Sequence, residues 1–227
     1  MLRRTLPLIL TLALWVTPLC AATIVIPPGE FKKASQELGG AVAYRNVAPA
    51  SALGVSGFDV GVEATAIDIS SSYQIDNSSY ALLYMTRARA RVGLPWGVTV
   101  GGMLGWSPNT LAKEYGLEVG KEILSDGVLL PALGLRGTYS RLGGLEPLSL
   151  STWGADATVS KKILFLTPYA GLGPQWISSK LNGSTEAFWQ MRYFGGLQII
   201  PFPLLRVTAE VEREAKTAYT LKVGIGF

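Results

Sequence analysis

The C-terminal stretch YTLKVGIGF, Tyr219 to Phe227, alternates between apolar or aromatic residues at odd positions and small or polar residues at even positions. Successive side chains of a β-strand point to opposite faces, so this alternation predicts a strand with one apolar face. The opposite face carries Lys222 among small residues. An apolar face of this kind needs lipid or another apolar surface against it.

A period of two extends over most of the chain and predicts ten strands. Their lengths match the roughly 9 to 11 residues that a tilted strand needs to cross a bilayer. Regular spacing with turn residues between strands is typical of a closed up-and-down sheet. The predicted fold class is therefore all-β, an antiparallel up-and-down transmembrane β-barrel of about 10 strands, with 8 or 12 as alternatives. The predicted strands cover residues 57–69, 80–93, 98–106, 112–121, 128–140, 152–160, 164–177, 187–199, 205–212 and 217–227.

The first 22 residues have the order of a secretory signal peptide. Two arginines at positions 3 and 4 form a basic start, an apolar run extends from Leu6 to Val16, and Ala21 precedes the expected cleavage after Ala22. The run is too short to be a spanning helix. Cleavage would remove Cys20, the single cysteine. Lipid attachment at Cys20 is an alternative that the residues before it fit poorly.

The composition suits a membrane protein better than a soluble domain. Charged residues make up 16% of the chain and the mean hydropathy is +0.30, which is more apolar than an average soluble domain. The net charge of +4 falls to +2 when the two arginines of the signal are removed. This small excess gives no reason to expect a nucleic-acid partner.

The chain divides into three predicted parts: a signal peptide over 1–22, an N-terminal periplasmic lead-in over 23–56 and a transmembrane barrel over 57–227. Within the lead-in, prolines, a helix-like middle and a Gly-Gly stop predict a short helix from about Glu30 to Leu38. One short strand is expected over 41–45. The remainder of the lead-in is expected to be irregular.

The connections between predicted strands alternate in length. Short turns at 94–97, 160–162 and 201–204 alternate with longer polar loops at 70–79, 141–151 and 178–186. In barrels of this type short turns face the periplasm and long loops face outside. Ten strands therefore place both the N-terminus and the C-terminus of the protein on the periplasmic side.

Three arginines on one face of the second strand identify the lumen. Arg87, Arg89 and Arg91 share a face, while the alternate positions of that strand are mostly apolar. An arginine facing lipid at the bilayer midplane costs about 2 to 4 kcal/mol, so this face should point inward. The first strand has the same pattern, with Asp59 and Glu63 opposite its apolar face.

A single register joins these charges. A hairpin centred on residue 75 places Glu63 opposite Arg87 and Asp59 opposite Arg91, with Arg89 between them. A slip of one residue would turn all of them toward lipid. The charges are interpreted as a structural salt-bridge network that fills a narrow barrel, and the alternative is a constriction that selects anions.

Charged residues on the other strands complete a mixed lumen. Eight strands leave a barrel just wide enough to be filled by its side chains, so ten strands lined with long charged groups should be largely plugged. Glu210 and Glu212 share one face, where Arg206 and Lys222 can neutralise them. The predicted lumen charge network is Asp59, Glu63, Arg87, Arg89, Arg91, Glu114, Glu118, Arg136, Arg192, Arg206, Glu210, Glu212 and Lys222.

Aromatic residues lie near many of the predicted strand ends. This placement suits the two interfacial girdles of transmembrane barrels, although sheet proteins are rich in aromatic residues in general. The residues concerned are Trp96, Trp106, Tyr115, Tyr139, Trp153, Trp176, Trp189, Tyr219 and Phe227.

Motifs for catalysis are missing from the sequence. It contains no histidine, which removes the usual general base, the commonest metal ligand and every Ser-His or Cys-His arrangement. No segment has the spacing of an EF-hand. The sequence therefore predicts no enzyme activity, no catalytic residue, no metal and no cofactor.

With the apolar run LPLILTLALWV at its start and LKVGIGF at its end, the chain resembles small bacterial outer-membrane β-barrel proteins as a general class. The resemblance implies an outer-membrane location in a Gram-negative bacterium and contact with outer-membrane lipid. It also implies that Phe227, with Leu221, Val223 and Ile225, forms a signal read by the barrel-assembly machinery, and that periplasmic chaperones act during export. It selects no subfamily.

Three functions are compatible with these predictions. The first is a monomeric barrel with a salt-bridged, largely plugged lumen and a structural or surface-interaction role. The second is a narrow, porin-like channel or small-ligand transporter that uses the arginine row. The third is an exported soluble β-protein with an internal pocket.

Overall fold

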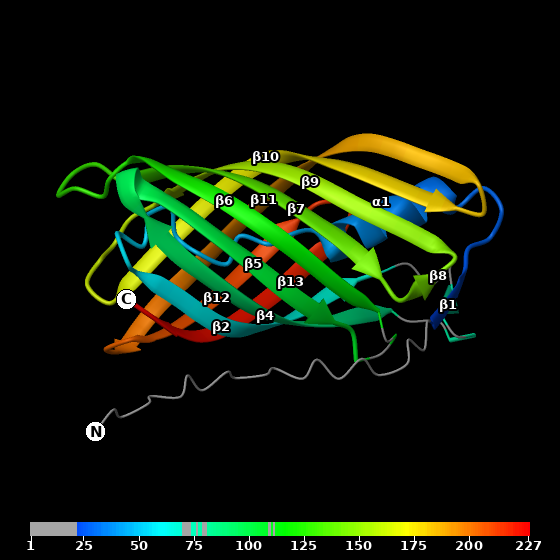
Figure 1. Cartoon of the computed structure of the whole chain (residues 1–227), viewed down its shortest axis with the longest axis horizontal. Coiled ribbons are helices and arrows are strands. Elements are labelled where there is room, and N and C mark those ends of the chain that lie inside the picture. Colours follow the sequence, from blue (N-terminus) through cyan, green and yellow to red (C-terminus); the bar gives the residue numbers. More distant parts are fainter. Residues whose placement is uncertain (1–21, 70–73, 76, 79–80, 109, 111) are drawn as a thin grey trace, which may run out of the picture.

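The structure is a computed structural model that describes residues 22–69, 74–75, 77–78, 81–108, 110 and 112–227. Ten antiparallel strands close into a barrel, and each pairs with the next barrel strand along the chain until β13 pairs with β2 (Figure 1). The predicted fold class and the count of ten strands are confirmed. The barrel strands are β2 (Phe58–Asp68), β4 (Leu82–Leu94), β5 (Val98–Trp106), β6 (Lys113–Leu124), β7 (Ala132–Gly143), β9 (Leu148–Ser160), β10 (Leu166–Leu181), β11 (Ser184–Phe202), β12 (Leu205–Arg213) and β13 (Thr217–Gly226).

The alternation that predicted the last strand is present in its burial. Along Tyr219 to Phe227 the odd-numbered residues are exposed on the outside of the barrel and the even-numbered residues are buried. The register predicted for the first hairpin is also confirmed, because Glu63 is paired with Arg87 and Asp59 with Arg91. Inward and outward faces are therefore assigned correctly from the sequence.

Two predicted polar loops are mostly strand. β10 and β11 meet at a two-residue turn, Asn182 and Gly183, instead of a loop over 178–186. Both turn residues have positive φ, 48° and 87°, the backbone that a two-residue hairpin turn requires and that Asn-Gly adopts readily. The loop expected over 141–151 likewise contains the ends of β7 and β9 and the short β8 (Leu145–Glu146).

A small three-stranded sheet lies at one end of the barrel. β1 (Ala22–Val25) is at its centre, antiparallel to β3 (Gln74–Ile75) and parallel to β8. We call this end the cap end. The opposite end, where Phe227 lies beside the start of β2, is the C-terminal end (Figure 1).

Residues 31–53, which belong to the predicted lead-in over 23–56, lie inside the barrel. Helix α1 (Phe31–Val42) packs against β7, β9, β10 and β11. Residues 43–53 then continue along the lumen, and residues 41–48 are all buried. We call residues 31–53 the lumenal segment.

The lumenal segment runs from one end of the barrel to the other. Thr23 is in β1 at the cap end, whereas Phe227 is at the C-terminal end, beside the start of β2. The first and last strands of the barrel therefore have their outer ends on the same side, and β1 lies on the opposite side.

The predicted helix forms but is longer than expected. It continues through Gly39 and Gly40 to Val42, so the short strand expected over 41–45 is wrong. The two glycines lie within the helix instead of ending it. Because they have no side chains, they allow the helix to lie close to the barrel wall. A Cβ atom at Gly39 would lie 2.6 Å from Cδ1 of Ile177 on β10. No helix of the described residues is long and apolar enough to cross a bilayer.

An apolar core fills the cap end of the lumen. It joins the buried face of α1 to inward side chains of the barrel and to the small sheet, and burial of this kind is the main favourable term in folding. The helix is too short to be stable by itself, so these contacts hold it in place. The core residues are Ile24, Ala34, Leu38, Ala41, Val42, Ile67, Ile69, Ile75, Leu83, Met85, Ala112, Leu142, Leu145, Leu148, Leu150 and Ala218.

The close approach at Gly39 gives a test of the helix position. Gly39→Val should lower the free energy of unfolding by about 1–3 kcal/mol, because its side chain overlaps Ile177. Adding Ile177→Ala should recover part of the loss. Denaturant unfolding in detergent micelles measures both effects. Gly143→Val is the matched control, since a Cβ atom there meets no other atom within 4 Å; equal effects at the two glycines would contradict the packing.

Candidate functional site

The charged layer of the lumen lies beyond the apolar core, toward the C-terminal end. All thirteen charged residues predicted to line the lumen take inward positions, and twelve of them are buried. Arg206 is the partly buried exception. Asp156 on β9 and Glu214, after β12, also take part in this layer.

The arginine row of β4 forms ion pairs with carboxylates of β2 and β6. Nε of Arg87 donates a short hydrogen bond to Glu114 on β6, while Glu63, directly opposite on β2, is 3.8 Å away. Glu63 instead lies 3.3 Å from Nη2 of Arg89. The predicted register is therefore right, but Arg87 forms its closest ion pair with β6, which is not its neighbour, because its guanidinium reaches past Gly105 on β5.

Arg91 divides its charge between two carboxylates. It lies 2.5 Å from an oxygen of Glu118 and 3.7 Å from an oxygen of Asp59. Asp59 has a nearer partner, since Nζ of Lys222 donates to both of its oxygens at 2.7 Å. Lys222 therefore does not neutralise Glu210 and Glu212 as expected.

Arginines of the wall bind the backbone of the lumenal segment. Arg89 donates to the carbonyl oxygens of Asn46 and Arg45, each at 2.9 Å. Arg192 donates to the carbonyl of Tyr44 at 2.8 Å. Carbonyl groups that have left a helix must find other donors when they are buried, and here the wall supplies them.

Arg45 completes the network from the opposite direction, and sequence reasoning missed it. Its guanidinium donates to Glu212 on β12 and to the carbonyl of Gly40 at 2.9 Å. Glu210 accepts hydrogen bonds from the Val47 backbone at 2.9 Å and from the Tyr169 hydroxyl at 2.8 Å. No periodic pattern marks Arg45, because it lies on an irregular segment.

Two more contacts fix the segment. The guanidinium of Arg89 lies 4.5 Å from the ring centre of Tyr44, a cation–π distance. The hydroxyl groups of Ser35 on α1 and Ser179 on β10 are 2.6 Å apart. The lumenal segment is thus bound to β10 at Ser35 and to β4 at Tyr44.

The charged layer binds the lumenal segment. The described residues contain no group of His, Cys, Asp and Glu side chains that could hold a metal ion. Most of the charged groups of the layer form ion pairs with one another or hydrogen bonds with backbone carbonyls. The arrangement can hold a segment firmly in the lumen.

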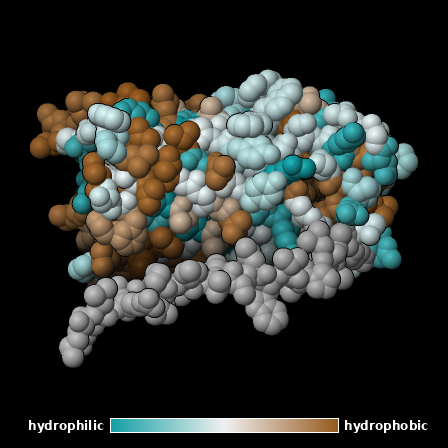
Figure 2. Space-filling view, in the orientation of Figure 1, coloured by the Kyte–Doolittle hydropathy of each residue, from teal (hydrophilic) through white to brown (hydrophobic). Residues whose placement is uncertain are grey.

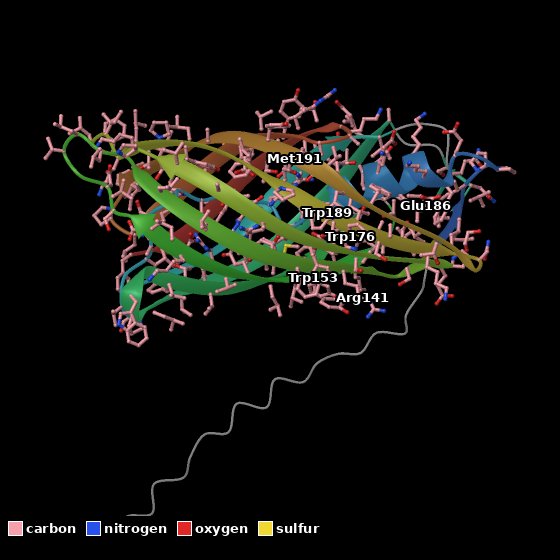
Figure 3. The ribbon with its side chains drawn as sticks, turned by 90° about the horizontal axis from the view of Figure 1, so that it is seen from above. Arg141, Trp153, Trp176, Glu186, Trp189 and Met191 are labelled. Carbon is pink, nitrogen blue, oxygen red and sulfur yellow. The ribbon has the colours of Figure 1, made fainter. Side chains whose placement is uncertain are left out.

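The outside of the barrel carries a row of aromatic side chains. Tyr139, Trp153, Trp176 and Trp189 are directly paired across β7, β9, β10 and β11. The rings of Trp176 and Trp189 are 5.1 Å apart. Figure 3 shows the three tryptophans close together, with Glu186 nearer the cap end. This row fits an interfacial girdle.

The surface between this row and the C-terminal end is apolar. Figure 2 shows hydrophobic residues gathered over the C-terminal end and more polar ones over the half with the cap. The turns at this end also expose large apolar residues, including Trp96, Leu129 and Leu164, which are 85%, 90% and 83% exposed. So large an apolar surface marks contact with a membrane or another protein.

Lys161 ties two of these turns together. Its ammonium donates to Asp126 at 3.0 Å and to carbonyl oxygens of the β6–β7 turn. The Lys161 hydrogen bond, helped by the Lys162 backbone, holds the pKa of Asp126 below its usual range. The two apolar turns are therefore held as one unit.

No protein-family description matches this sequence, and no curated protein matches it. Solved structures with a similar fold include the KdgM porin, at 9% identity, covering 74% of this chain and 99% of that chain with a TM-score of 0.43. Ail, the attachment invasion locus protein of Yersinia pestis, is 15% identical over 76% of this chain and 97% of its own, with a TM-score of 0.33. Neisserial surface protein A is 14% identical over 74% of this chain and 95% of its own, with a TM-score of 0.36.

At these identities the likenesses concern the fold and not the activity. The closed ten-stranded barrel with its apolar exterior has the architecture of a small outer-membrane β-barrel protein. No subfamily follows from it.

The ion pair between Arg87 and Glu114 gives a test of the network. Arg87→Met should lower the free energy of unfolding by about 3–5 kcal/mol, because Glu114 is left buried without its partner. Adding Glu114→Gln should recover part of that loss, and a double-mutant cycle measures the coupling. Glu63→Gln is the matched control. A coupling of Arg87 to Glu63 larger than its coupling to Glu114 would contradict the pairing.

Glu214 gives a prediction for pH. Burial, together with the nearby Glu212, raises the pKa of Glu214 to about 7, against the opposing effect of Arg192 and Arg45. Because the folded pKa lies above the unfolded value, the contribution of this group to stability is present at acidic pH and is lost as pH rises through 7. Glu214→Gln should therefore reduce the fall in unfolding free energy between about pH 5 and 8. An unchanged pH profile would contradict this assignment.

Proposed function

We propose that this protein is an outer-membrane barrel whose lumen is closed by its own lumenal segment and whose role is structural or one of surface interaction. One observation carries the proposal: residues 41–48 are all buried inside the barrel, and arginines of the wall donate to their carbonyl groups. A lumen filled in this way leaves the outer surfaces as the parts that meet other molecules.

The use of the arginine row disfavours the channel alternative. A constriction that selects anions needs donors that face an open path. Arg87 and Arg89 are instead at most 2% exposed, and they bind Glu114, Glu63 and the lumenal segment. Their charge serves to hold the segment in place.

The apolar exterior disfavours the alternative of an exported soluble protein. Outward residues of the closing strand, such as Leu221, Val223 and Ile225, are each about half exposed. A soluble barrel would place polar residues at these positions. Outer-membrane lipid is the contact proposed for them.

The proposed orientation follows from the C-terminus. We place Phe227 on the periplasmic side, where the barrel-assembly machinery would recognise it together with the end of β13. The cap end then faces outward, and the small sheet of β1, β3 and β8 becomes the exposed part of the protein. The proposed form is a monomer that binds no nucleic acid and carries no enzyme activity.

The contact between Ser35 and Ser179 provides the experiment. The variant Ser35→Cys/Ser179→Cys should form a disulfide in the intact membrane, because the two hydroxyl oxygens are 2.6 Å apart. Planar bilayers containing the wild type should show no defined current, and the oxidised variant should behave in the same way. Gel migration before and after reduction detects the crosslink.

The matched control is Ser35→Cys/Ser149→Cys, since Ser149 lies on the outer face of β9. It should remain uncrosslinked. A steady current through the wild type, or equal crosslinking in both variants, would contradict a closed lumen.

A further inference from the structure

A cavity of about 190 Å³ lies at the C-terminal end of the lumen, beyond the charged network. It is much larger than the roughly 10–15 Å³ that a single water needs. One side is formed by the end of the lumenal segment, including Pro49 and Leu53. The other side is formed by the wall, with Arg91, Thr167, Gln198 and Arg206, and by Lys162 at the rim.

The lining of this cavity is cationic. It includes two arginines and a lysine, and it includes no Asp or Glu. The wall adds a hydroxyl and an amide as neutral polar groups, those of Thr167 and Gln198. Both can donate hydrogen bonds to an anion.

The guanidinium of Arg206 has no partner in the part of the chain that the structure describes. Among the described residues it has no side-chain hydrogen bond or ion pair, and its Nε atom is buried. Its stem lies against the last residues of β13, where a Cβ atom at Gly226 would come within 3.3 Å of that Nε. A partly buried guanidinium in this state is poorly compensated.

Asp59, the carboxylate whose charge acts on Arg206, is already shared. Asp59 accepts both hydrogen bonds of Lys222 and lies 3.7 Å from Arg91. Arg91 has a second partner in Glu118, which does not line the cavity. The positive charge of Arg206 therefore remains available to something that enters from the mouth of the barrel.

We propose that this cavity binds one phosphate group. The planar guanidinium of Arg206 offers two parallel donors that match the oxygens of a phosphate. Lys162 adds a second charge at the rim, and Thr167 and Gln198 add neutral donors. The volume leaves room for a small organic group attached to the phosphate, as in a soluble phosphate ester or a phospholipid headgroup.

Calorimetric titration tests the proposal on the whole mature protein in a neutral detergent. Inorganic phosphate, at an ionic strength held constant with chloride, should bind with one equivalent per chain. Arg206→Gln and Lys162→Gln should each weaken the affinity by about tenfold, the loss expected for a charge-assisted contact. Arg206→Lys should weaken it less. Lys180→Gln, an exposed change at the cap end, should leave it unchanged.

Two outcomes would overturn the site: no binding of phosphate beyond that of chloride, or equal affinity in wild type and Arg206→Gln. Heat-modifiable migration checks that each variant is folded. Lys162 is exposed, so its variant keeps the test decisive if Arg206→Gln fails to fold.

Two further titrations distinguish a soluble phosphate ester from a lipid headgroup as the source of the phosphate. Tighter binding of glycerol phosphate than of inorganic phosphate assigns the site to a soluble ester. Tighter binding of a short-chain phosphatidylglycerol assigns it to a lipid headgroup. Neither result depends on whether the lumen conducts, so this site and the closed lumen can fail independently.

Discussion

Compensation of buried guanidinium groups is the constraint on which this structure depends. The wall places Arg87, Arg89, Arg136 and Arg192 inside a closed barrel, each less than a tenth exposed. A buried charge without partners is strongly destabilising. Carboxylates of the wall compensate part of this charge, and carbonyl groups of the lumenal segment supply the remaining acceptors. The segment in turn needs the arginine donors, because after Val42 its buried carbonyl groups have no hydrogen bonds within a helix.

This mutual need explains the order of layers along the lumen. At the cap end, α1 is held by apolar contacts with the wall. In the middle, ion pairs hold an irregular stretch whose carbonyl groups face several strands. At the C-terminal end the segment leaves a cavity, and there Arg206 has no acceptor among the described residues. The guanidinium groups that meet the segment thus have ion-pair or hydrogen-bond partners, whereas Arg206, beside the cavity, has none among the described residues.

The two surfaces of the barrel follow different rules. The outer surface is apolar between the aromatic row and the C-terminal end and more polar toward the cap, which is what a bilayer demands of a strand that crosses it. The inner surface is charged, and its charged groups bind one another and the lumenal segment.

Much of the fold was determined by the sequence alone. Alternation along a strand is local, so Tyr219 to Phe227, the arginine row and the first hairpin register could be assigned from the order of the residues. The cost of charge in lipid then decided which face pointed inward. The same reasoning placed all thirteen charged residues that it named on the inward face of the barrel, although the ion pairs expected between them were partly wrong.

The tertiary structure decided what occupies the lumen and which charges meet. Gly105 on β5 leaves space between β4 and β6, so Arg87 binds Glu114 instead of Glu63, its directly opposite neighbour. The position of α1 depends on the volume enclosed by the ten strands, and no local sequence pattern predicts that volume. The contacts of Arg45 and the cavity beside Arg206 follow from that volume, because they arise only when distant parts of the chain enclose the same space.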